Sequence, residues 1–226
     1  MNISTSTSIR ALAFGFWSAV LAAGLAIAFA ILAVAFPAPE WHGIQAYAEA
    51  FRPVQMASFI PAALLSLAVV VVMVSLHYAV PEEGRIYTLL AVVLTVMYAT
   101  FVCFNYYLQL FVVRLNLLAG QLEGLALLAM PNFHSAFFAL EAIGYFFASL
   151  ATLAAAPVFS GGRLEGWIRG LFILNGAIGV FGIIVAPFDR PFLILATLGL
   201  WVVYFPIAMI LVALYFRNAR KAMKGP

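Results

Sequence analysis

Charge is scarce in this chain, and that scarcity excludes most soluble folds. Only 8% of its 226 residues are Asp, Glu, Lys or Arg, whereas 66% are hydrophobic. Soluble domains carry about 25% charged residues and about 45–50% apolar ones. The formal net charge of +3 does not indicate a nucleic-acid partner, because the basic residues sit at the ends of apolar segments, where membrane topology uses them. The composition therefore predicts an integral membrane protein.

Lysine, cysteine and histidine are also sparse, and each shortage excludes a type of chemistry. No lysine precedes Lys221, so no predicted membrane helix can form a retinal Schiff base. The single cysteine, Cys103, excludes an intramolecular disulfide and a cysteine-rich metal site. The three histidines fall in separate segments, whereas a zinc site needs three or four clustered ligands. P-loop and common hydrolase motifs are missing as well. We therefore expect no metal and no cofactor, and these shortages favour a function other than catalysis.

Long apolar runs are what the sequence does contain, and they predict an all-α fold in one domain, residues 1–226. A membrane-spanning helix needs about 20 mostly apolar residues, and six stretches meet this requirement. Their expected ranges are 9–36, 53–80, 86–113, 132–158, 164–185 and 191–216. The fold class is thus an integral membrane bundle of six transmembrane helices.

Two connecting segments are longer than simple turns. In "EWHGIQAYAEAFR" (40–52), Trp41, Ile44 and Phe51 share one helical stripe, which predicts a short interfacial helix with this stripe toward the acyl chains. Glu49 and Arg52 should then face water. The segment 114–132 is interrupted by two glycines, so it is either an interfacial or re-entrant piece or an extension of the third helix.

The distribution of Lys and Arg predicts the orientation in the membrane. With six spans, both termini share one side. That side would hold eight basic residues, and the other side three: Arg52, Arg114 and Arg190. We therefore expect both termini in the cytoplasm and the 40–52 helix outside.

Polar residues inside the third, fourth and fifth spans mark the candidate site. In the predicted orientation those of the third span come late and those of the fourth come early, so both sets lie in the outer half of the bilayer. Glu141 would lie roughly 10–14 Å below the outer interface. His134 and Glu141 are seven residues apart, which places them on one face of a continuous helix. The candidate ligand- or proton-binding residues are Glu141, His134, Asn105, Gln109, Asn175, Tyr98, Tyr145 and Arg114.

Three functions fit this pattern. In the leading interpretation, an outward-facing polar pocket has Glu141 at its floor and His134 at its mouth, and it binds or translocates a small polar or amphipathic ligand. A carboxylate at bilayer depth is costly enough to need a partner or a purpose, and Glu141 would bind a proton, a cation or an amine. In the second, Asn105, Gln109, Glu141 and Asn175 only join helices by hydrogen bonds, and the chain is an accessory subunit of a membrane complex. The third is a cofactor-free membrane enzyme that uses Glu141 and His134 as acid and base.

Glu141 should in either of the first two cases face the bundle interior and hydrogen-bond a polar group of the third or fifth span. The expected partners of the whole protein are membrane lipids, the ligand, and a second copy or another membrane subunit.

The stretch "NFHSAFFALEAIGYFFASLA", with "YYLQLFVVR" before it and "GWIRGLFILNG" after it, resembles uncharacterised multi-pass prokaryotic membrane proteins of the domain-of-unknown-function type. The resemblance covers roughly the second half of the chain. It implies a location in the inner (plasma) membrane of a prokaryotic cell. It implies no particular activity, because those families have no settled activity to carry over.

Overall fold

A computed structural model describes residues 3–185, 188 and 191–224, with the side chains of 3–8, 191, 193–198 and 224 left out. Six long helices dominate it, and each is long and apolar enough to cross a membrane. They are α1 (Ile3–Ala35), α3 (Phe59–Ala79), α4 (Arg85–Tyr107), α6 (Ala136–Ala155), α7 (Arg163–Val185) and α8 (Pro191–Lys224). In such helices every main-chain polar group is satisfied within the segment, as a lipid environment requires. The predicted all-α bundle of six spans is confirmed.

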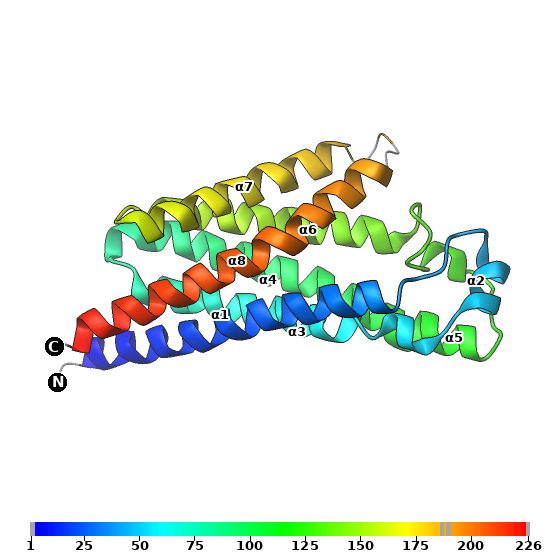
Figure 1. Cartoon of the computed structure of the whole chain (residues 1–226), viewed down its shortest axis with the longest axis horizontal. Coiled ribbons are helices and arrows are strands. Elements are labelled where there is room, and N and C mark those ends of the chain that lie inside the picture. Colours follow the sequence, from blue (N-terminus) through cyan, green and yellow to red (C-terminus); the bar gives the residue numbers. More distant parts are fainter. Residues whose placement is uncertain (1–2, 186–187, 189–190, 225–226) are drawn as a thin grey trace.

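The six helices form a ring in the order of the sequence. Each one packs against its neighbours along the chain, and α8 closes the ring by packing against α1. Successive helices run in opposite directions, so both termini lie at one end of the bundle (Figure 1). We call this the termini end, and we call the opposite end, which carries α2 (Ile44–Ala50), the α2 end. α1 and α8 meet at the termini end and diverge toward the α2 end (Figure 1).

Glycines allow close approach where the ring helices meet. Gly15 on α1 lies under the ring of Phe216 on α8, and a Cβ atom built there would be 2.6 Å from that ring. A Cβ atom built at Gly144 on α6 would lie 3.1 Å from Val102 of α4, and one built at Gly176 on α7 would lie 3.0 Å from Leu153 of α6. Small residues at such positions let membrane helices gain van der Waals contact.

The helix boundaries differ from the predicted ones at several places, and α1 and α3 begin at Ile3 and Phe59 where residues 9 and 53 were predicted. α4 continues through the π-helical segment η3 (Leu108–Val113) into α5 (Arg114–Leu118), so the segment after Arg114 extends the third span by only one turn. α6 begins at Ala136, four residues later than expected, and α8 continues to Lys224. Arg190, one of the three basic residues predicted outside, lies outside the described residues.

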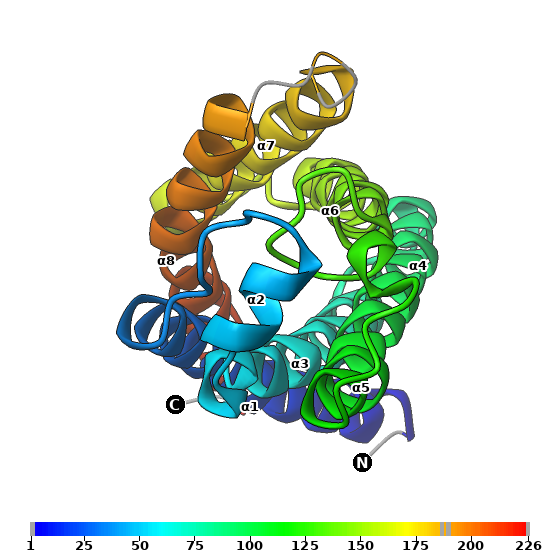
Figure 2. The same cartoon turned by 90° about the vertical axis from the view of Figure 1, so that its right-hand side faces the viewer.

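The α2 end of the ring is covered by protein. α2 lies across the ring when the bundle is viewed from that end (Figure 2). Its Tyr47 and the following Phe51 are buried against Phe59 of α3 and Tyr106 of α4, in a cluster that also includes Leu125 of the segment between α5 and α6. The short helix in the first loop is therefore present, and Glu49 and Arg52 are exposed as predicted.

The direction of the apolar stripe on α2 was predicted wrongly. Phe51 is buried within the protein, and Trp41 and Ile44 pack against the same cluster, instead of facing acyl chains. A helix with one apolar face is satisfied equally by lipid and by an apolar protein surface, and here the open end of the ring provides that surface.

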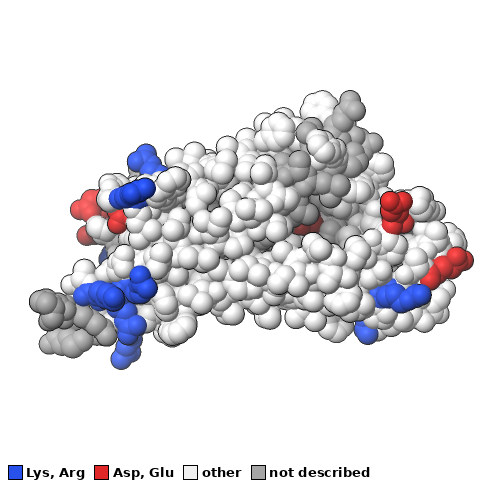
Figure 3. Space-filling model, in the orientation of Figure 1, with Lys and Arg blue, Asp and Glu red and all other residues white. Residues whose placement is uncertain are grey.

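Charged side chains gather at the two ends of the bundle, with a broad uncharged band between them (Figure 3). This band coincides with the six apolar spans. The chain is therefore described below as a multi-pass membrane protein.

Candidate functional site

Glu141 lies on α6, and its carboxylate is held by two side chains of α4. Asn105 donates from Nδ2 to Glu141 Oε1 at 3.0 Å, and the Tyr106 hydroxyl donates to Oε2 at 3.4 Å. The predicted hydrogen bond between Glu141 and the third span is thus present. Among the residues that the structure describes, no Lys, Arg or His nitrogen forms an ion pair with Glu141.

The position of Asn105 is fixed by a second bond. Its Nδ2 also donates to the main-chain oxygen of Phe137 at 3.1 Å, so both amide hydrogens point at acceptors. This pairing decides which end of the amide is the oxygen. Asn105 is only 1% exposed, and its Oδ1 has no hydrogen-bond partner among the described residues. Buried acceptors of this kind are rare and call for an explanation.

Aromatic side chains surround the carboxylate. Tyr106 stacks on Phe59 with ring centroids 5.1 Å apart, and Tyr145 packs against the cluster of buried side chains that contains both. The Tyr145 ring also meets those of Tyr98 and Trp201, at 5.7 and 5.5 Å. Tyr98 and Tyr145 were predicted at this site, whereas Tyr106 was not. Tyr106 follows Asn105, which lies on the inward face of α4. Because such a face is about 100° wide, it can include the adjacent residue as well.

Gln109 and Arg114 lie apart from Glu141. Gln109 is 1% exposed, and its side chain holds the segment between α5 and α6 by donating to Leu128 O at 2.7 Å and accepting from Met130 N at 3.3 Å. Arg114 is half-buried at the start of α5. Gln109 therefore anchors the segment that covers the α2 end. It lies one helical turn beyond Asn105, the residue that holds the Glu141 carboxylate.

His134 does not share a helical face with Glu141, which corrects the prediction. It precedes α6, whose N-cap residue is Ser135, and its side chain is exposed. Its main-chain N–H donates to Asn132 Oδ1 at 3.0 Å, in a turn that is incompatible with a helix starting at residue 132. Ser135 is a residue type that favours N-cap positions, and Pro131 stands just before the turn, so both are signals of the later start.

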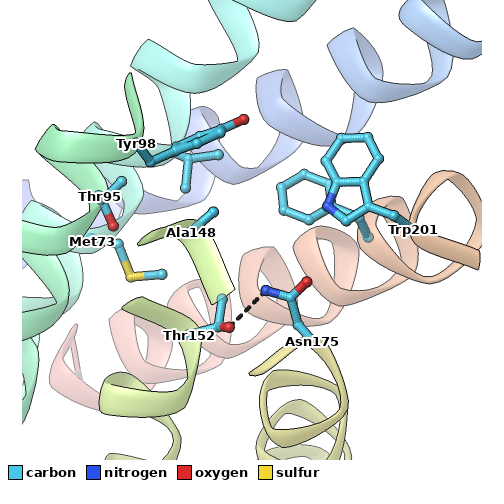
Figure 4. A pocket seen from close by; sticks show the side chains of 9 residues that line it. Met73, Thr95, Tyr98, Ala148, Thr152, Asn175 and Trp201 are labelled. Atoms are coloured by element: carbon cyan, nitrogen blue, oxygen red, sulfur yellow. Dashed lines mark hydrogen bonds between the residues drawn. The ribbon is translucent and has the colours of Figure 1, made fainter. Parts of the chain in front are cut away.

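Asn175 belongs to a second polar group, nearer the middle of the bundle. It donates from Nδ2 to Thr152 Oγ1 at 2.7 Å, and its Oδ1 accepts from the Tyr204 hydroxyl. Beside this group lies an internal cavity of about 10 Å³, measured as the space open to the centre of a water molecule. Five helices line it, and Thr95, Tyr98, Thr152 and Asn175 are its polar side chains (Figure 4). That volume suits about one water molecule.

Glu141 is also partly open to the outside. Its side chain is half-buried, whereas Asn105 beside it is buried. Figure 3 shows acidic atoms at a hollow in the uncharged band, on the side of the bundle where α1 and α8 diverge. We call this hollow the lateral recess.

The site is therefore a partly exposed carboxylate with neutral donors, set in the apolar band of a membrane protein. Within the described ranges, no three His, Cys, Asp or Glu side chains are grouped so that they could hold a metal ion. No family model, curated protein or solved structure matches this chain. What the chain is shown to be is an all-α, multi-pass membrane bundle with six candidate spans.

Proposed function

We propose that the protein binds the cationic head of a small amphipathic molecule at Glu141. The observation that carries this proposal is Glu141 itself, half-buried in the apolar band, with a carboxylate paired only with neutral donors in the described part of the chain. An ionised carboxylate at such depth costs at least about 2.5 kcal/mol on insertion scales. A cation at the carboxylate offsets most of that cost.

The orphaned oxygen of Asn105 narrows the class of cation. Oδ1 belongs to the amide that also bonds Glu141, so it lies within a few ångströms of the carboxylate. A cation that carries N–H groups can bond the carboxylate and Oδ1 together, whereas a quaternary ammonium leaves Oδ1 unpaired. The faces of Tyr98, Tyr106 and Tyr145 favour a cation of either type. The proposed ligand head is a protonated amine.

The route to the site favours a ligand with an apolar tail. α2 and the segment between α5 and α6 cover the axial path into the ring (Figure 2). The lateral recess opens instead on the apolar band, where a tail stays in the bilayer while the head reaches Glu141. With both termini in the cytoplasm of a prokaryotic cell, as the basic residues favour, the ligand would enter from the outer leaflet of the inner membrane.

Binding of octylamine to the protein in lipid nanodiscs tests the proposal. Titration calorimetry should show saturable binding to the wild type, at least about tenfold weaker binding to Glu141→Gln, and little change for Glu49→Gln, an exposed acidic residue on α2. Octanol should bind much more weakly, because it lacks the charge. Equal octylamine affinity for the two variants, or equal affinity of the wild type for octanol, would contradict the proposal.

A structural role is the second candidate, and one observation favours it. Both oxygens of Glu141 accept hydrogen bonds from the protein's own side chains, as they would if α4 and α6 were simply joined. In that case octylamine should bind neither the wild type nor the variants above the level of empty nanodiscs. The chain would then be an accessory subunit of a membrane complex.

A further inference from the structure

The inward face of α4 carries polar groups from one end of the bundle to the other. Thr88, Thr95, Tyr98, Asn105 and Gln109 repeat at intervals of three, four and seven residues, and each is at most 2% exposed. Such spacing places them on one helical face. Thr88 and Gln109 are separated by 21 positions (109 minus 88), which is about 31 Å along a helix. That length matches the hydrocarbon core of a bilayer, about 30 Å thick.

Other helices contribute polar groups at several depths along this face. Nearest the α2 end, Glu141 bonds Asn105 and Tyr106, and Tyr145 packs against the cluster that contains Tyr106. The Tyr145 ring then meets that of Tyr98, which lines the water-sized cavity with Thr95, Thr152 and Asn175. Tyr204 of α8 bonds Asn175 beside that cavity.

The termini end of the face has a titratable partner. Thr88 Oγ1 lies 3.0 Å from Nδ1 of His77, a half-buried residue at the end of α3. A group that can gain and lose a proton thus stands near each end of the polar face: Glu141 on the side of α2 and His77 on the side of the termini.

Joining of helices does not account for Thr95. Its hydroxyl donates to Ala91 O of its own helix at 2.7 Å and, among the described residues, bonds no other helix, yet it lines the cavity. Thr100 makes the same bond to its own helix, to Val96 O at 2.9 Å, but its side chain is exposed on the outside of the bundle. Thr95 and Thr100 make the same bond to their own helix, but Thr95 faces the cavity and Thr100 faces outward. They are therefore a matched pair for substitution.

We propose that this inward face of α4 conducts protons between Glu141 and His77 through the water-sized cavity at Thr95. Each hydroxyl or water accepts a proton on its oxygen and releases its own proton to the next group, so one proton enters at one end and one leaves at the other. Only O–H and N–H bonds form and break, and no oxidant or reductant takes part. Between Thr95 and Thr88 the face carries Ala91, and conduction requires water molecules to enter that stretch of about 10 Å.

Proton flux into liposomes tests the proposal without any added ligand. The protein is reconstituted into vesicles that contain a pH-sensitive dye, with potassium and valinomycin holding the membrane potential near zero, and a pH gradient is applied. The wild type should dissipate the gradient several-fold faster than protein-free vesicles. Glu141→Gln keeps one acceptor oxygen for Asn105, presents an NH2 group to the Tyr106 hydroxyl and holds no acidic proton. It should return the rate to that of protein-free vesicles.

The threonine pair separates conduction from general damage to α4. Thr95→Val should slow the flux several-fold, Thr95→Ser should restore most of it because the hydroxyl is kept, and Thr100→Val should leave it unchanged. Wild-type flux equal to that of empty vesicles would overturn the proposal, and so would equal effects of the two valine variants. Octylamine binding without proton flux would refute only this proposal, and proton flux without octylamine binding would refute only the proposed function.

Discussion

Asn105 shows how one side chain can define a site at the residue scale. Because both of its amide hydrogens are used, by Phe137 O and by Glu141, its oxygen has a single fixed direction. The inward direction of Asn105 could be predicted from the sequence, since a polar residue in a membrane helix avoids lipid. Its partner could be narrowed only to a short set of candidates, because helical spacing gives a face and a depth but no distance between helices.

Substitutions of Glu141 should show whether its hydrogen bonds or its charge contribute to the stability of the fold. Glu141→Gln keeps an oxygen for Asn105 and should leave the free energy of unfolding nearly unchanged. Glu141→Leu leaves Asn105 Nδ2 and the Tyr106 hydroxyl without their shared partner, and should lower that free energy by about 1–3 kcal/mol. Urea unfolding in mild detergent, followed by circular dichroism, measures both values. A leucine variant as stable as the wild type would show that these bonds contribute no net stability.

The segment between α5 and α6 illustrates at the element scale how a loop is held over an apolar core. Gln109 reaches out of the π-helical segment and bonds the main chain at Leu128 and Met130, while Leu125 and Ala129 are buried beneath. π-helical turns of this kind occur often at functional sites. The sequence did not decide whether this segment is an interfacial or re-entrant piece or an extension of the third helix, because its two glycines interrupt any regular pattern.

Gln109→Leu should loosen this segment while leaving the spans intact. The substitution removes the partners of one partly buried carbonyl and one partly buried N–H, at a local cost of about 1 kcal/mol or more. Hydrogen exchange followed by mass spectrometry should show faster exchange in residues 119–132 and little change in α6. Asn116→Leu is the control, since its side chain bonds only Val112 O within the same helical run. Equal exchange in both variants would show that Gln109 is not the anchor.

α2 should detach from the bundle at high pH. Burial raises the pKa of Tyr47 to about 12, above its ordinary value of 10.0. Between those two values the detached helix has lost the phenol proton while the docked helix keeps it, so docking weakens as pH rises, by about 1.4 kcal/mol per unit. Trp41, whose ring lies 6.1 Å from that of Tyr47, should report the change by fluorescence. Tyr47→Phe should abolish this transition, and its persistence in that variant would contradict the assignment.

At the scale of the whole molecule, the six spans follow from hydrophobicity, whereas the closed ring does not. Apolar length predicts how many helices cross the bilayer, and alternating direction places both termini at one end. The contact between α1 and α8 depends on details such as Gly15 beneath Phe216, which composition does not reveal. The apolar stripe of α2 was misassigned for a related reason, because lipid and protein surfaces are equally apolar.

The orientation of the bundle stays a prediction, and cysteine labelling tests it. In a Cys103→Ser background, Gln45→Cys on α2 and Met223→Cys near the end of α8 both place a thiol at an exposed position. An impermeant maleimide should label the first in intact cells and the second only after the cells are opened. Labelling of Met223→Cys in intact cells, with protection of Gln45→Cys, would reverse the orientation and place Glu141 nearer the cytoplasm.

Closure of the ring by α8 has a consequence for how the protein is made. α8 is synthesised after the other five spans, so until it emerges the bundle is an open arc with its inner surface uncovered on one side. Glu141 already has Asn105 and Tyr106 as partners at that stage, because α4 and α6 have both left the ribosome. Asn175 has Thr152 of α6 but acquires the Tyr204 hydroxyl only with α8. The nascent chain thus shields its carboxyl group before the last helix completes the wall around it.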